Sequence, residues 1–164
     1  MVYMSTDTTW ETLSTSSDET EKLGESIGQK LRGGEVIELV SDLGGGKTTL
    51  VRGLVRGLGS DAVVSSPTFM LERIYPARLE VHHFDLYRLG ESGVLGQELQ
   101  ESLEEEGVVN VIEWGDVAHD ILPAGRLKIE LKRTPHQGED VRQIVMTYPS
   151  ELEYLMPAGP KDQS

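Results

Sequence analysis

The sequence contains no cysteine, so neither a disulfide framework nor a thiolate zinc site is possible in its 164 residues. No apolar run approaches the roughly 18 residues that a membrane-spanning helix needs. The opening stretch MVYMSTDTTWETLSTSSDET has neither the basic nor the apolar region of a secretory signal. These absences predict a cytoplasmic protein that does not enter a membrane, and the length predicts one domain.

Positive charge is scarce, because 15 lysine and arginine residues stand against 28 aspartate and glutamate residues, for a net charge of −13. An extensive nucleic-acid interface needs a cationic surface, so direct contact with RNA or DNA is expected to be weak or indirect. A small anion can still bind at a local site, because salt screens the global field beyond about 8 Å.

Hydrophobic periodicity predicts the element order α, β, loop, α, β, β, α, β and a C-terminal β-hairpin. The fold class expected from this order is α/β, with a mixed central β-sheet flanked by helices. The expected domain covers residues 16–149. Residues 1–15 are aperiodic and are expected to be flexible, and residues 150–164 are expected to be a loose tail in which Leu152, Tyr154 and Leu155 dock.

One stretch carries a chemical motif: VIELVSDLGGGKTTLVRGL, residues 36–54. It fits the phosphate-loop pattern G-x-x-x-x-G-K-[ST], except that Ser41 stands at the first glycine position. Its glycines let successive N–H groups converge on a phosphate at a helix N-terminus. Lys47 would reach the β- and γ-phosphates, Thr48 would join the Mg²⁺ shell, and Thr49 would bond toward the α-phosphate. The alternative is a glycine-rich turn that only caps the helix.

Two carboxylates follow apolar strands, Asp85 after VHHF and Glu113 after VVNVI. Ligands of open α/β sheets bind at such strand ends, and a phosphate loop needs one acid for magnesium and one to orient the attacking group. Both acids could instead be ordinary strand-terminal residues that face water. Thr68, in SSPTF, either carries a hydroxyl that senses Mg²⁺ and the γ-phosphate, as in nucleotide switches, or is part of a plain turn. Trp114 is expected to pack or to support Glu113.

The adjacent histidines His82 and His83 are predicted to lie on one strand and to point to opposite faces of the sheet. A joint metal site is therefore unexpected.

Four stretches together, DLGGGKTTLVRGL, SSPTF, HHFDLYRL and VIEW, resemble the bacterial tRNA threonylcarbamoyladenosine (t6A) biosynthesis ATPase family of the TsaE (YjeE) type. The similarity covers roughly residues 16 to 148. It implies a P-loop NTPase-like domain and a Mg²⁺-dependent ATPase, with ATP as substrate, required for t6A37 modification of tRNA. It also implies that the protein acts on a complex of a TsaD-type transferase and a TsaB-type paralogue and supports its turnover.

The resemblance also implies roles for individual residues. The family's nucleotide loop matches Asp42, Leu43, Gly44, Gly45, Gly46, Lys47, Thr48 and Thr49. Thr48 and Glu113 match its Mg²⁺ positions, and Asp85 and Thr68 match positions tied to hydrolysis. Ser17 and Thr20 match the helix that lies near the base of the nucleotide, and Arg142 matches an arginine near the nucleotide. The sequence departs from the family's nucleotide-loop pattern at Ser41 and Gly45.

Two other functions fit the same motif. One is a regulatory module that binds the nucleotide but no longer hydrolyses it. The reason to consider it is Ser41 at the first glycine position of the motif. The other is a small-molecule P-loop kinase, which would need an arginine-bearing lid where the sequence predicts a β-hairpin. As an ATPase the protein is expected to be slow on its own, because the sequence offers no obvious second arginine finger.

Overall fold

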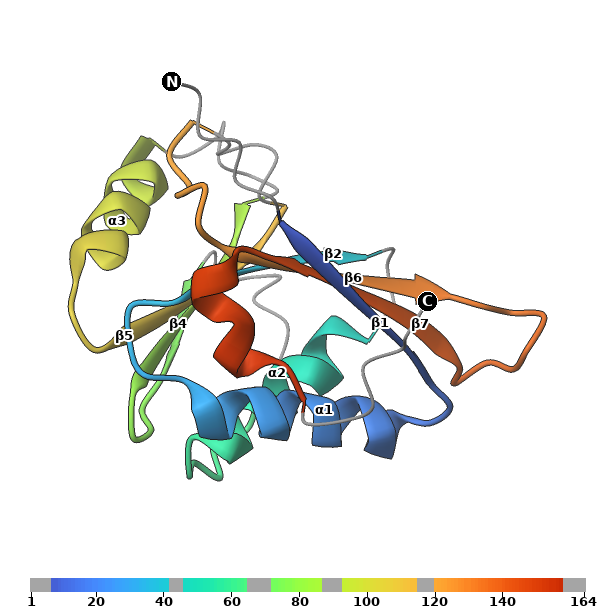
Figure 1. Ribbon diagram of the computed structural model, residues 1–164. Helices are drawn as coiled ribbons and strands as arrows, with labels where there is room; N and C mark the ends of the chain where they lie inside the picture. Colours follow the sequence, from blue (N-terminus) through green and yellow to red (C-terminus); the bar gives the residue numbers. More distant parts are fainter. Residues whose placement is uncertain (1–6, 42–45, 65–71, 87–92, 115–119, 158–164) are drawn as a thin grey trace, which may run out of the picture.

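A seven-stranded mixed sheet forms the centre of the computed structural model, in the order β1-β7-β6-β2-β5-β4-β3 (Figure 1). The structure describes residues 7–41, 46–64, 72–86, 93–114 and 120–157. The strands are β1 (Thr8–Ser14), β2 (Val36–Ser41), β3 (Glu72–Tyr75), β4 (Glu80–Asp85), β5 (Val108–Glu113), β6 (Leu127–Arg133) and β7 (Arg142–Tyr148). The helices are α1 (Ser17–Lys30), α2 (Lys47–Gly57), α3 (Gly93–Glu104) and the short 3₁₀-helix η3 (Ser150–Leu155). Within these ranges no helix is long and apolar enough to span a bilayer.

The middle of the sheet is parallel. Strand β2 pairs in parallel with β5 and β6, and β4 pairs in parallel with β5. The carboxyl ends of β2, β4 and β5 therefore meet at one edge, where Asp85 and Glu113 are partners in register. Every residue of β5 is buried, which confirms the prediction of a strand covered on both faces.

Two hydrophobic clusters cover the two faces of the sheet. The larger cluster contains the apolar residues of α1 and α2, and the smaller one contains Leu99 of α3 with Phe84 and Ile112. Figure 1 shows α1 and α2 together on one side of the sheet. The predicted apolar face of α2 is confirmed, because all five of its residues are buried: Leu50, Val51, Leu54, Val55 and Leu58.

Helices α1 and α2 touch through glycine at four positions, Gly24, Gly28, Gly53 and Gly57, each facing backbone of the other helix. A Cβ atom on Gly28 would lie 2.1 Å from the Leu54 carbonyl oxygen, and one on Gly53 would lie 2.0 Å from the Glu21 carbonyl oxygen. No side chain fits into such a space. This contact was not predicted from the sequence, and it sets how close the start of α1 lies to the start of α2.

The N-terminal region differs from expectation. The prediction of a flexible segment over residues 1–15 is wrong for Thr8–Ser14, which form β1 and pair antiparallel with β7 along their whole length. An edge strand with one face in water needs few apolar residues, and threonine suits a strand. Ser14 Oγ and Thr20 Oγ1 share a 2.7 Å hydrogen bond that ties the end of β1 to α1.

The C-terminal region is also more ordered than predicted. Residues Ser150–Leu155 form η3, so the expectation of a loose tail is wrong there, and the expected docking of Leu152 and Leu155 is confirmed by their burial. The Tyr154 hydroxyl donates a 2.7 Å hydrogen bond to Glu35 Oε2, and the Arg32 guanidinium lies 3.9 Å from the Tyr154 ring centroid. Burial, and then the bond to Glu35, raise the pKa of Tyr154 well above its usual range.

The substitution Tyr154→Phe removes the hydroxyl that donates to Glu35. We expect the free energy of unfolding to fall by about 1–2 kcal/mol, because a hydrogen bond to a charged acceptor is lost. Urea denaturation should show a lower midpoint with an unchanged m-value. In a Glu35→Gln background the same substitution should cost less, and equal costs in the two backgrounds would contradict the coupling.

Candidate functional site

The site begins where the central strand β2 passes into α2. Gly46 is the N-cap of α2 with φ 99° and ψ 13°, a left-handed conformation that suits glycine. Because glycine has no side chain, the first N–H groups of α2 receive no side-chain cap from it. The predicted loop residues Asp42, Leu43, Gly44 and Gly45 lie outside the described residues. Ser41 is the last residue of β2, and among the described non-glycine residues only Trp114 has a positive φ. A serine is therefore sterically compatible with this position.

Lys47, the first residue of α2, faces the end of β5. Its Nζ lies 3.6 Å from Glu113 Oε1, and Glu113 is only 4 % exposed. The other carboxylate oxygen, Oε2, lies 3.3 Å from His83 Nε2 on the neighbouring strand β4, without the alignment of a full hydrogen bond. Each oxygen of Glu113 thus has its own nitrogen neighbour.

Opposing effects set the charge of Glu113. Burial raises the pKa of the carboxyl group, while His83 and then Lys47 lower it, and the net result is a pKa below the ordinary value. Glu113 is therefore an ionised, buried carboxylate near neutral pH. Such a group is costly unless a cation balances it.

Trp114 follows Glu113 directly and is the strained residue of the site. Its φ is 62°, it is 50 % exposed, and its ring centroid lies 5.9 Å from Lys47 Nζ. A non-glycine residue in the left-handed region persists only where its surroundings hold it, and such residues cluster at functional sites. Trp114 lies beside Lys47 and Glu113, and a simple role in core packing does not fit its exposure.

A second group of residues gathers beside the α2 N-terminus. A pocket of about 110 Å³ brings together side chains from the starts of α1 and α2 and from the end of the β6–β7 turn. It is lined by Ser17, Thr20, Gly46, Thr49, Asp140 and Arg142. The structure therefore gathers Ser17, Thr20 and Arg142 beside Gly46 and Thr49, although they are far apart in the sequence. Asp140 was not anticipated, and its only sequence signal is its place two residues before Arg142.

The remaining predicted residues are placed as follows. Asp85 ends β4 in register with Glu113, and Thr48 is the half-buried second residue of α2. Thr68 lies outside the described residues.

The two histidines face opposite sides of the sheet, as predicted. His82 Nδ1 is 2.8 Å from Ser102 Oγ on α3, whereas His83 faces Glu113. The contact between His83 and Glu113 was not predicted. Alternation along the strand places His83 and Asp85 on one face, but it does not show that β5 is the neighbouring strand.

The donor set of the site suits magnesium held jointly with a phosphate ligand. In the part of the chain that the structure describes, no three histidine or acidic side chains cluster to hold a metal by themselves. Mg²⁺ usually takes one or two carboxylates and completes its shell with water and substrate phosphates. The buried carboxylate of Glu113 and the hydroxyl of Thr48 are oxygen donors of this kind.

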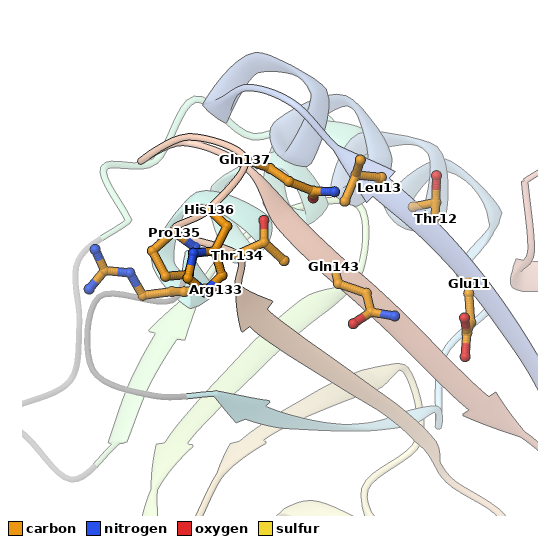
Figure 2. Close-up of a pocket in the computed structure, with 9 residues that line it drawn as sticks. All are labelled: Glu11, Thr12, Leu13, Arg133, Thr134, Pro135, His136, Gln137 and Gln143. Atoms are coloured by element: carbon orange, nitrogen blue, oxygen red, sulfur yellow. The ribbon is translucent and has the colours of Figure 1, made fainter.

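A separate pocket of about 740 Å³ lies between β1 and the β6–β7 turn. Figure 2 shows its lining residues: Glu11, Thr12, Leu13, Arg133, Thr134, Pro135, His136, Gln137 and Gln143. Leu13 of β1 is paired with Gln143 of β7. The next residue, Ile144, belongs to the core under α1 and α2. Because side chains alternate along a strand, Gln143 lies on the opposite face of the sheet. This pocket shares no residue with either group of the candidate site.

Comparisons with known proteins agree with the motifs. The family model described as "Threonylcarbamoyl adenosine biosynthesis protein TsaE" matches residues 14–144. A protein of Bacillus subtilis named tRNA threonylcarbamoyladenosine biosynthesis protein TsaE is 36% identical over 140 residues, which is 84% of each chain. The protein of the same name from Streptomyces coelicolor is 37% identical and covers 77% of this chain and 88% of its own. A solved structure titled "Crystal structure of Bacillus subtilus YdiB" has a TM-score of 0.75, with 29% identity over 91% of this chain and 92% of that one.

Proposed function

The chain belongs to the TsaE family of threonylcarbamoyl adenosine biosynthesis proteins, and we propose that it works there as a Mg²⁺-dependent ATPase. Membership places it in t6A biosynthesis and supports nucleotide binding by a P-loop NTPase-like fold. The observation that carries the proposal is the buried, ionised Glu113 facing Lys47 at the point where the central strand enters α2.

In this proposal the phosphates of ATP lie against the N-terminus of α2, where N–H groups and the helix dipole favour negative charge. Lys47 turns from Glu113 Oε1 to the β- and γ-phosphates and neutralises their charge. Thr48 and Glu113 hold Mg²⁺, which would offset charge that develops on the phosphates during transfer. Hydrolysis then depends mainly on positioning and charge stabilisation.

The other residues receive roles from their motifs and, where the structure describes them, from their places in the fold. Asp85, beside Glu113 in the sheet, orients the attacking water, and Thr68 senses the γ-phosphate. Thr49 bonds toward the α-phosphate at the edge of the small pocket. The nucleoside end lies along that pocket, where Ser17, Thr20 and Arg142 converge.

The proposed partners are a TsaD-type transferase and its TsaB-type paralogue, whose turnover the ATPase supports. A net charge of −13 favours binding to protein partners over direct binding to tRNA. Because the pathway modifies tRNA, we place the protein in the cytoplasm. Among the described residues of the two groups, Arg142 in the small pocket is the one arginine, and none lies beside Lys47 and Glu113, so hydrolysis without partners is expected to be slow.

The experiment that tests this function is multiple-turnover ADP release and t6A formation with the reconstituted partners. We expect Asp85→Asn to keep nucleotide affinity and to lower ADP release about 10²- to 10⁴-fold, the usual contribution of a positioned general base. Glu104→Gln, at the end of α3, is the matched control and should behave as the wild type.

Each contrary result points to a different conclusion. Unchanged turnover in Asp85→Asn would transfer the water-orienting role to Glu113. Tight nucleotide binding by the wild type with no turnover would identify a non-hydrolysing regulatory module. A metabolite that accelerates ADP release without the partner proteins would indicate a kinase, although the predicted hairpin, β6 and β7, stands where a kinase lid would be needed.

A further inference from the structure

His83 is a buried histidine that makes no well-aligned hydrogen bond with the rest of the described chain. It lies within β4, is 1 % exposed, and neither ring nitrogen has a hydrogen-bond partner among the described residues. Buried polar atoms are nearly always paired, so an unpaired one in a native protein calls for an explanation. Arg73, directly opposite His83 across the β3–β4 pair, also has a buried Nε atom without a partner in the described part of the chain.

The neighbouring histidine shows what a structural role looks like. His82 is also buried, but its Nδ1 is 2.8 Å from Ser102 Oγ and its Nε2 is 2.5 Å from Glu80 Oε1. Ser102 in turn bonds the side chain of Asn110 on β5. This network fixes α3 to the sheet and uses both nitrogens of His82. Within the described ranges, no comparable network engages His83.

His83 instead lies between an aromatic ring and the carboxylate of the site. Its ring centroid is 6.4 Å from that of Tyr75, which is buried on β3, and its Nε2 is 3.3 Å from Glu113 Oε2. Alternation along β4 puts His83 on the same face as Asp85, and the parallel β4–β5 register brings Glu113 to that face as well. The imidazole is therefore held by its strand and by Tyr75 in a place that faces one oxygen of Glu113.

We propose that His83 is a positioning residue for Glu113, which fixes the Oε2 atom so that Oε1 is presented to the Mg²⁺–nucleotide. The inference rests on the proposed function, because Lys47 faces Oε1 at 3.6 Å and must leave it for the phosphates. Once Lys47 has turned away, His83 is the neighbour that keeps the carboxylate from rotating. Partners of this kind orient a metal ligand without touching the metal.

The test compares two substitutions of His83 with a matched substitution of His82. His83→Leu removes the nitrogen and keeps much of the bulk, whereas His83→Gln restores an amide at about the reach of Nε2. His82→Leu disturbs an equally buried histidine on the other face of the same strand. Fluorescent ADP is titrated into each protein at a series of Mg²⁺ concentrations, and the Mg²⁺ concentration that gives half of the affinity gain is measured.

We expect His83→Leu to raise this Mg²⁺ midpoint about 10- to 100-fold, the usual effect of removing a group that orients a metal ligand. Affinity for ADP without Mg²⁺ should stay as in the wild type, and His83→Gln should return the midpoint most of the way. His82→Leu should lower the thermal midpoint and leave the Mg²⁺ midpoint unchanged. If His83→Leu does not fold, His83→Asn replaces it, because its shorter amide does not reach Oε2.

Other results overturn the inference. An unchanged Mg²⁺ midpoint in His83→Leu, or an equal loss of ADP affinity with and without Mg²⁺, would show that His83 only supports the fold. Wild-type protein that binds no ADP, either alone or with the partner proteins, would overturn the proposed function itself, and the role of His83 with it. The wild-type titration therefore tests the proposed function, and the comparison of His83→Leu with the wild type tests the inference.

Discussion

Replacing Lys47 by alanine is expected to weaken binding of ATP and ADP by roughly 10- to 150-fold. The substitution removes charge-assisted hydrogen bonds to phosphate, worth about 1.5–3 kcal/mol. It also takes away one of the two groups that face Glu113, whose Oε1 atom lies 3.6 Å from Lys47 Nζ. Because His83 still faces Oε2, the site keeps one neighbour for the carboxylate, and the fold should be retained.

The measurement is a titration of fluorescent ATP and ADP into the wild type and Lys47→Ala, with and without Mg²⁺. Lys132→Ala, an exposed lysine on β6, is the control for a general change of charge. Unchanged affinity in Lys47→Ala would show that the phosphates do not lie at the start of α2. If the wild type fails to bind, repeating the titration with the partner proteins separates a disabled loop from a site that the partners complete.

Placing a methyl group on Gly53 is expected to lower the free energy of unfolding by about 2 kcal/mol or more. A Cβ atom there would lie 2.0 Å from the Glu21 carbonyl oxygen, so the two helices must move apart. Overpacking costs about 1–3 kcal/mol and sometimes more, which exceeds the gain of up to about 1 kcal/mol that alanine brings to a helix interior. In a protein of this size the thermal midpoint should fall by about 4–8 °C.

Gly125→Ala is the matched control for this prediction, because no atom of the described residues, other than those of its chain neighbours, lies within 4 Å of the Cβ position at Gly125. That control should stay within about 0.5 kcal/mol of the wild type. A more stable Gly53→Ala protein would mean that helix propensity dominates and that α1 and α2 do not approach so closely. Because the same contact places Ser17 and Thr20 near Thr49, a separation of the helices should also weaken nucleotide binding.

Elements whose apolar residues follow a clear period were predictable from the sequence. The face of α2, the buried strand β5 and the hairpin of β6 and β7 were all predicted, because burial imposes its period on these segments. Strand β1 was missed because an edge strand that pairs with β7 needs little apolar surface. Helix η3 was predicted only as three docking residues, since its order depends on Glu35 and Arg32, distant in the sequence.

The site was predictable as a motif and less so as an arrangement. The sequence places Lys47 and Glu113 by their local patterns, and the structure brings them within 3.6 Å. The sequence does not show that β4 is a neighbour of β5, so the approach of His83 to Glu113 was not predicted. The left-handed conformation of Trp114 likewise depends on surroundings that no local pattern records. The roles given to the site residues stay predictions, and Thr68 and the loop at residues 42–45 also lie outside the described residues.

The pairing of β1 with β7 affects how the chain folds during its synthesis on the ribosome. Among the described strands, β1 pairs with β7 alone, and Thr8 is opposite Tyr148, so β1 has no partner in the sheet until β7 has been made. The nascent chain must therefore keep this edge of the sheet incomplete until then, and non-local pairings of this kind close slowly. Completion of the sheet at this edge thus follows the synthesis of β7.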